Sequence, residues 1–285
     1  MDGANLATPT GSQSALIQLV QERLAAGQLP LPTLPDLALR IDAIVGAEAV
    51  GAADVATAIS QDPATAARLI QAANSAYAAS RVRVQSTQAA VTRLGLAYSR
   101  ALVHRVALEQ MFLARSYDLQ RLAQECWRVS LDVAALSEAL ARECSDLAPE
   151  TAMTAGLLHR VGLLPLIRLF DDEPELLDDE TQLEPVATAV GPSIGRDLLA
   201  HWSFPRLLQE IPELAVMPDY QHTGPSDYAD LVLTARYGCA LAAGESAPTV
   251  PVHALGKLGL APGRAFLQAS TIRLAHEKAR QRLEC

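Results

Sequence analysis

Helix start and stop signals recur along the whole chain. Asp62-Pro63 is the clearest start, because an N-cap acceptor precedes a proline at the first helical position. Alanine, the best helix former, is the commonest residue. Valine and isoleucine do not fall into the alternating pattern of a half-buried strand. The sequence therefore predicts an all-α fold.

These signals also predict how the chain is divided. Helices are expected over residues 14–26, 36–45, 54–59, 62–79, 86–113 with a break at Gly95, 118–143 and 149–158, and Pro205, Ser226 and Pro262 each open a further helix. The 285 residues suffice for one large domain or two small ones. We place a boundary near 115–118, which gives a flexible N-terminus at 1–13, an N-terminal helical subdomain at 14–116 and a C-terminal helical subdomain at 117–285.

Composition limits the compartment and the partners. Half of the residues are hydrophobic, which excludes a disordered chain. The first eleven residues lack Lys and Arg, and no apolar run is long enough to span a membrane, so neither a secretory signal nor a membrane anchor is expected. Four separated cysteines indicate reduced thiols in a cytoplasmic protein. A net charge of -9 makes nucleic acid an unexpected partner.

The charge is unevenly distributed. Residues 171–184 carry eight acids and no Lys or Arg, whereas residues 81–128 carry eight arginines against three acids, a balance of +5. Both segments are typical of solvated surfaces. Alternatively, one segment docks a charged partner, or the two segments dock on each other.

One motif matches a hydrolase pattern. Gly191-Pro192-Ser193-Ile194-Gly195 fits G-x-S-x-G, in which a serine nucleophile stands on a strand-to-helix turn. Because the chain offers no parallel strands to carry such a turn, a glycine-framed helix start is favoured. Gly256-Lys257-Leu258 lacks the flanking residues of a phosphate loop and is interpreted as a turn.

A linked set of motifs carries a family resemblance. They are Leu31-Pro32-Thr33-Leu34-Pro35, Ile59-Ser60-Gln61-Asp62-Pro63, Ala73-Asn74-Ser75-Ala76-Tyr77, Leu94-Gly95, Trp127, the run Ala155-Gly156-Leu157-Leu158-His159-Arg160-Val161-Gly162, Trp202-x-x-Pro205 and His222. In order and spacing they resemble the HDOD family, the HD-related output domain of bacterial signalling proteins. The resemblance implies an N-terminal helical subdomain, a C-terminal HD-like bundle, and regulation more often than catalysis.

The resemblance also locates a damaged metal site. HD hydrolases hold divalent metals with a histidine, a His-Asp pair and a later aspartate. Here Arg160 follows His159, and Arg236 stands where the later aspartate would be. The first-helix histidine has no counterpart near Trp127, and Gly191 replaces a further histidine of some relatives. Guanidinium groups in place of carboxylates repel a cation, so we expect no metal, no cofactor and no catalysis.

The sequence thus predicts a non-catalytic regulatory module with a degenerate pocket of His159, Arg160, His222 and Arg236. The resemblance implies signalling partners, such as cyclic-dinucleotide enzymes, sensor kinases or other regulators, which the module is expected to find in trans. Two alternatives stay open. One is a metal-dependent HD-type phosphohydrolase or phosphodiesterase. The other is a nucleotide or anion sensor using Arg160 and Arg236, unless these two arginines only form structural ion pairs or face solvent.

Overall fold

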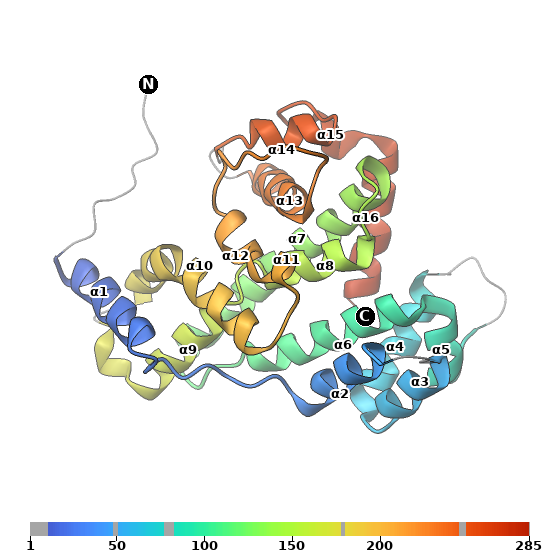
Figure 1. The fold of residues 1–285 in the computed structure, drawn as a ribbon, viewed down its shortest axis with the longest axis horizontal. Coiled ribbons are helices and arrows are strands. Elements are labelled where there is room, and N and C mark those ends of the chain that lie inside the picture. The colour runs from blue at the N-terminus through green and yellow to red at the C-terminus, as the bar shows by residue number, and fades with distance from the viewer. Residues whose placement is uncertain (1–10, 48–50, 77–82, 178–179, 245–248, 285) are drawn as a thin grey trace.

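The protein is described by a computed structural model covering residues 11–47, 51–76, 83–177, 180–244 and 249–284. All regular elements within these ranges are helical, which confirms the predicted all-α class (Figure 1). The first half contains α1 (Gly11–Ala25), α2 (Asp36–Val45), α3 (Ala52–Ser60), α4 (Pro63–Ala76), α5 (Thr87–Leu94), α6 (Leu96–Met111) and α7 (Tyr117–Cys144). The second half contains α8 (Pro149–Leu158), α9 (Leu163–Asp172), the 3-10 turns η1 (Pro174–Leu176) and η2 (Glu180–Gln182), α10 (Leu183–His201), α11 (Arg206–Gln209), α12 (Ile211–Leu214), α13 (Tyr228–Ala243), α14 (Val252–Lys257), α15 (Ala265–Gln268) and α16 (Ser270–Leu283).

Several predicted helix ends are set by local capping residues. The Asp62 carboxylate accepts the Thr65 amide at 2.7 Å at the start of α4, and the Ser86 hydroxyl accepts the Ala89 amide at the start of α5. Gly95, at a φ of 85°, separates α5 from α6. The predicted extension of α4 to Ala79, including Tyr77, lies outside the described residues.

Other predicted starts are displaced. Helix α3 begins at Ala52, so Asp54 closes a capping box with the Gly51 amide instead of serving as the N-cap. Helix α13 takes Asp227, not Ser226, as its N-cap, because the Asp227 carboxylate accepts the Asp230 amide. The predicted turn at Gly256-Lys257 was wrong, since both residues lie at the end of the short helix α14.

The helices enclose two hydrophobic cores. The smaller core is built by α2–α6 around buried side chains such as Ile41, Ile59 and Leu69. The larger core is centred on α7, α8, α10 and α13. Helix α6 contributes Leu102 to the smaller core and Leu108 to the larger one, so it connects the two halves (Figure 1).

The N-terminal helix differs from the predicted grouping of residues 14–116. Helix α1 packs against α10, and its buried Leu16 and Val20 belong to the larger core. Arg23 also forms a two-pronged ion pair with Glu173 beyond α9, at 2.6 and 2.8 Å. The proline-rich segment then leads the chain across to α2 (Figure 1). Along this segment the Pro32 carbonyl accepts a hydrogen bond from the Trp202 indole N–H at 2.7 Å.

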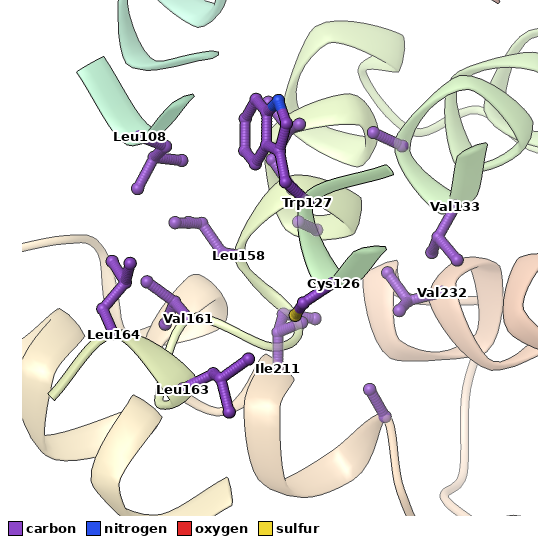
Figure 2. Close-up of a cluster of buried hydrophobic side chains, with 14 of the residues drawn as sticks. Leu108, Cys126, Trp127, Val133, Leu158, Val161, Leu163, Leu164, Ile211 and Val232 are labelled. Carbon is purple, nitrogen blue, oxygen red and sulfur yellow. The ribbon is translucent and has the colours of Figure 1, made fainter. Parts of the chain in front are cut away.

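The long helix α7 forms the spine of the larger core. It packs against α8, α13 and α16, and α16 also contacts α4. Figure 2 shows part of this core, with Trp127 and Val133 from α7, Leu158 from α8 and Val232 from α13. The backbones of α7 and α8 approach so closely that a side chain on Gly156 would meet the backbone of Ala134. Small residues at this crossing therefore fix the position of the turn that follows α8.

The residues 191–195 lie in the middle of α10, which excludes the strand-to-helix turn of a hydrolase nucleophile. The alternative of a helix start was also wrong, because α10 begins at Leu183. The Ser193 hydroxyl donates to the Val190 carbonyl at 3.0 Å, which occupies it within its own helix. The glycines instead permit close packing, since a side chain on Gly162 would collide with Gly191 and Gly195.

The stretch Pro149–Asp172 is the one segment among the described helices that is long and apolar enough to cross a membrane. An 18-residue window within it has a mean hydropathy of 1.3, and 89% of that window is buried inside the fold. The whole stretch comprises α8, the turn at residues 159–162 and α9, all packed in the larger core.

Several acids of the 171–184 segment are bound by other parts of the chain. Asp171 accepts the backbone amides of Arg115 and Ser116 at 2.7 and 3.1 Å, where α7 begins, and Asp172 pairs with the Arg115 guanidinium. The contact of Asp171 and Asp172 with Arg115 supports docking of the acidic and basic segments on each other at this point. Asp178 and Asp179 lie outside the described residues.

Candidate functional site

A cavity of about 600 Å³ opens beside the turn that follows α8. Its lining includes three of the four predicted site residues, His159, Arg160 and Arg236, together with Glu184 and Cys126. A smaller cavity of about 110 Å³ shares His159, Arg160, Glu184 and Arg236 and extends along α10. The structure therefore places His159, Arg160 and Arg236 at the same cavity.

His159 is held in one protonation and tautomeric state. The side chain is 3% exposed, and Nδ1 lies 2.6 Å from the Gly156 carbonyl oxygen. Because a carbonyl only accepts, Nδ1 carries the hydrogen. Burial, and next the Arg236 guanidinium, lower the pKa of His159 well below its ordinary value. The imidazole is therefore neutral near pH 7, with an unprotonated Nε2 that has no hydrogen-bond partner in the part of the chain that the structure describes.

Arg160 is already neutralised within the fold. Its Nη2 donates to both carboxylate oxygens of Glu184, in the first turn of α10, at 2.8 and 2.9 Å. This pair agrees with the structural ion pair considered from the sequence. It also accounts for Glu184, the last acid of the 171–184 segment.

Arg236 has no such carboxylate partner among the described residues. It projects from the middle of α13 and donates from Nη1 to the Ala215 carbonyl that follows α12. Burial, and next the like charge of Arg160, lower the pKa of Arg236 to about 10. It remains a cation at neutral pH, partly buried, at the wall of the cavity.

The residues of this site do not fit a divalent metal. HD chemistry needs carboxylates to balance the metal charge, and the only carboxylate that the two cavities share, Glu184, is paired with Arg160. Arg236 adds a second positive charge beside the lone imidazole acceptor of His159. A dication there would be repelled by Arg236 and would find a single nitrogen donor.

His222 does not belong to this cavity, which corrects the predicted pocket. Its Nε2 lies 2.9 Å from Asp230 Oδ2, and Asp230 also receives the Asp227 amide in the capping box of α13. The Lys257 ammonium of α14 lies 2.9 and 2.8 Å from the two ring nitrogens of His222. His222, Asp227 and Asp230 are close enough together to hold a metal. The Lys257 ammonium already supplies the positive charge at that position.

Sequence reasoning missed Cys126 and Glu184 as pocket residues. Cys126 is buried on α7, and burial, as the largest cause, raises the pKa of its thiol to about 11 (Figure 2). It is therefore a neutral wall residue. No local sequence pattern marks Cys126 as a pocket residue. Glu184 belongs to the acidic segment 171–184, and a search for a carboxylate partner of Arg160 within that segment would have included it.

The helical fold, with His159 and Arg160 at the turn after α8, defines the class: an HD-related all-α protein. Residues 31–215 match the family model of the HDOD domain, and the chain belongs to the HDOD family. This match confirms the resemblance found in the sequence. A comparison with proteins of curated function finds no match.

Solved structures agree with this assignment. A protein of Shewanella amazonensis SB2B with the provisional name metal-dependent phosphohydrolase is similar at 28% identity, a TM-score of 0.82, and coverage of 96% of this chain and 100% of that chain. An HDOD domain protein of unknown function from Geobacter sulfurreducens has 22% identity, a TM-score of 0.62, and coverage of 93% and 89%. A protein of Marinobacter aquaeolei VT8, provisionally named a signal transduction protein, has 20% identity, a TM-score of 0.63, and coverage of 100% and 69%. Together these comparisons support an HD-related all-α fold and membership of the HDOD family.

Proposed function

We propose that the protein is a non-catalytic signalling module that acts by binding other proteins. One observation carries this proposal. His159 shares its cavity with two arginines, Arg160 and Arg236, whereas an HD hydrolase needs carboxylates at such positions to hold its metal. A pocket that repels a dication cannot generate a metal hydroxide nucleophile. Family membership then favours a regulatory role, with signalling proteins as the partners.

A metal-dependent phosphohydrolase is the second candidate. The Shewanella amazonensis protein favours it, because its provisional name is a metal-dependent phosphohydrolase and it aligns with 96% of this chain. In such an enzyme His159 would be a metal ligand through Nε2, and Arg236 would have to move away or bind the substrate anion.

Metal analysis and a phosphodiesterase assay on one preparation decide between the candidates. The purified full chain is expected to hold far less than one equivalent of Mn, Fe or Mg, and to show no turnover of a chromogenic phosphodiester with any of these metals added. A metal-dependent phosphodiesterase assayed in parallel shows that the conditions support catalysis. Stoichiometric metal together with turnover would disprove the non-catalytic function.

The partner is sought by affinity capture from the native cell. The tagged full chain is expected to retain at least one signalling protein, identified by mass spectrometry. Heat-denatured bait serves as the control for non-specific adsorption. The interaction is then repeated with both purified proteins, and failure of every captured protein to bind directly would contradict the proposal.

A further inference from the structure

The charges around the large cavity leave one cation unbalanced. Asp132 lies 3.3 Å from Arg128, and Glu184 is held by Arg160, so two of the three arginines that line the cavity are paired. Arg236 is the third, and it has no ion pair among the described residues. The remaining carboxylate, Glu125, is exposed at the rim, where solvent screens its charge.

His159, which lines the same cavity, has an unused hydrogen-bond acceptor. His159 Nε2 is buried and has no hydrogen-bond partner among the described residues, and it carries no hydrogen because the ring hydrogen is on Nδ1, which donates to the Gly156 carbonyl. A buried polar atom without a hydrogen bond is costly and rare, so it marks a place where a ligand or water binds. Its unprotonated lone pair can only accept, and it therefore calls for an O–H or N–H donor on the ligand.

We infer that the cavity binds a phosphate-type anion that also carries a hydroxyl, with Arg236 holding the anionic oxygens and His159 Nε2 accepting the hydroxyl hydrogen. Hydrogen phosphate supplies both groups itself, and a sugar phosphate supplies them from its phosphate and its ribose. Arg is suited to this role because its planar guanidinium can bind two anionic oxygens at once.

The available space agrees with a ligand larger than an inorganic ion. A volume of about 600 Å³ lies within the range that accommodates small-molecule ligands, whereas a free phosphate would fill only a fraction of it. This inference goes beyond the proposed function, because the cavity can bind a ligand whether or not a protein partner is found.

Phosphate and sulfate are the sharpest pair of probes. At pH 7.5 both are tetrahedral oxyanions of similar size and charge, but hydrogen phosphate has an O–H and sulfate does not. In isothermal titration of the full chain we expect saturable 1:1 binding of inorganic phosphate, and sulfate binding that is weaker by about tenfold. Ribose 5-phosphate and GMP, titrated in parallel, distinguish a free-phosphate site from a phosphate-ester site.

Variants assign the binding to the two groups. Arg236→Gln should weaken binding of the best probe by about tenfold or more, whereas Arg236→Lys, which keeps the charge, should retain part of it. His159→Phe keeps a ring at that position and should remove the preference for phosphate over sulfate. If this variant does not fold, the comparison of the two ions on the natural protein already tests the acceptor.

Arg128→Gln is the matched control, since Arg128 lines the same cavity but is exposed and paired with Asp132. It should leave the affinity unchanged. Absence of binding for phosphate, ribose 5-phosphate and GMP at millimolar concentration would overturn the inference. Equal affinity for phosphate and sulfate, or equal loss in the Arg128 and Arg236 variants, would do the same.

Discussion

Glu138 has no exposed surface, and it is the meeting point of two arginines. Arg142 lies one turn further along α7, whereas Arg282 comes from the C-terminal helix α16 and also lies over the Tyr98 ring at 5.2 Å. Removing one member of a buried ion pair leaves an uncompensated charge. Glu138→Ala should therefore lower the free energy of unfolding in urea by about 3 kcal/mol. Arg206→Ala, which removes an exposed pair, should change it by less than about 1 kcal/mol, and equal losses would contradict this role.

Buried neutral His159 makes stability depend on pH. Its folded pKa lies below its ordinary value of 6.5, chiefly because of burial, so the unfolded chain takes up a proton first on acidification. The contribution of His159 is therefore complete above about pH 6.5 and is lost as the pH falls below it. His276, whose pKa burial also lowers, acts in the same direction.

The test is urea unfolding of the natural chain and His159→Gln between pH 7.5 and 5. The variant should reduce the slope of stability against pH by up to about 1.4 kcal/mol per pH unit, and part of the slope should remain because of His276. His201→Gln, at an exposed position, is the matched control. An unchanged slope in the His159 variant would show that this imidazole is not held neutral.

At the level of elements, glycines decide how closely α10 approaches the turn after α8. A Cβ on Gly162 would collide with the Gly191 carbonyl and lie 2.6 Å from the Gly195 nitrogen, whereas a Cβ on Gly191 would meet nothing within 4 Å beyond its own helix backbone and its chain neighbours. Gly162→Ala should therefore destabilise the protein by about 2 kcal/mol or more through overpacking. Gly191→Ala should change stability by less than about 1 kcal/mol, because the higher helix propensity of alanine is offset by the contact of its Cβ with the ring of the following Pro192. Thermal unfolding of the two variants checks this difference in size.

The elements also show what the sequence could specify. Asp62, Ser86 and Gly95 act over a few residues, so the helix ends that they control were predictable. The family resemblance placed Arg160 and Arg236 in one predicted pocket, and in the structure both line one cavity. His222 was misplaced because its position depends on the Asp227–Asp230 capping box and on Lys257, 35 residues further along. Contacts of that kind leave no local pattern.

At the scale of the whole molecule, the order of the helices along the chain does not determine the core to which each helix belongs. Helix α1 precedes the smaller core in sequence but packs on the larger one, and α16 returns from the C-terminal end to contact both α7 and α4. The two halves are thus joined by α6, by the proline-rich segment and by α16.

Weakening each core separately tests whether α1 belongs to the larger core. Val20 of α1 and Ile59 of α3 have no exposed surface, and they belong to the larger and the smaller core respectively. Val20→Ala should cost about 2 kcal/mol and Ile59→Ala about 2–5 kcal/mol, because each leaves a cavity. In native-state hydrogen exchange, Val20→Ala should speed exchange in α1 and α10 while α3 and α5 stay protected. Ile59→Ala should speed exchange in α3 and α5 instead, since local opening follows the weakened core. Faster exchange in α3 after the Val20 change, with α10 unaffected, would place α1 with the N-terminal helices after all.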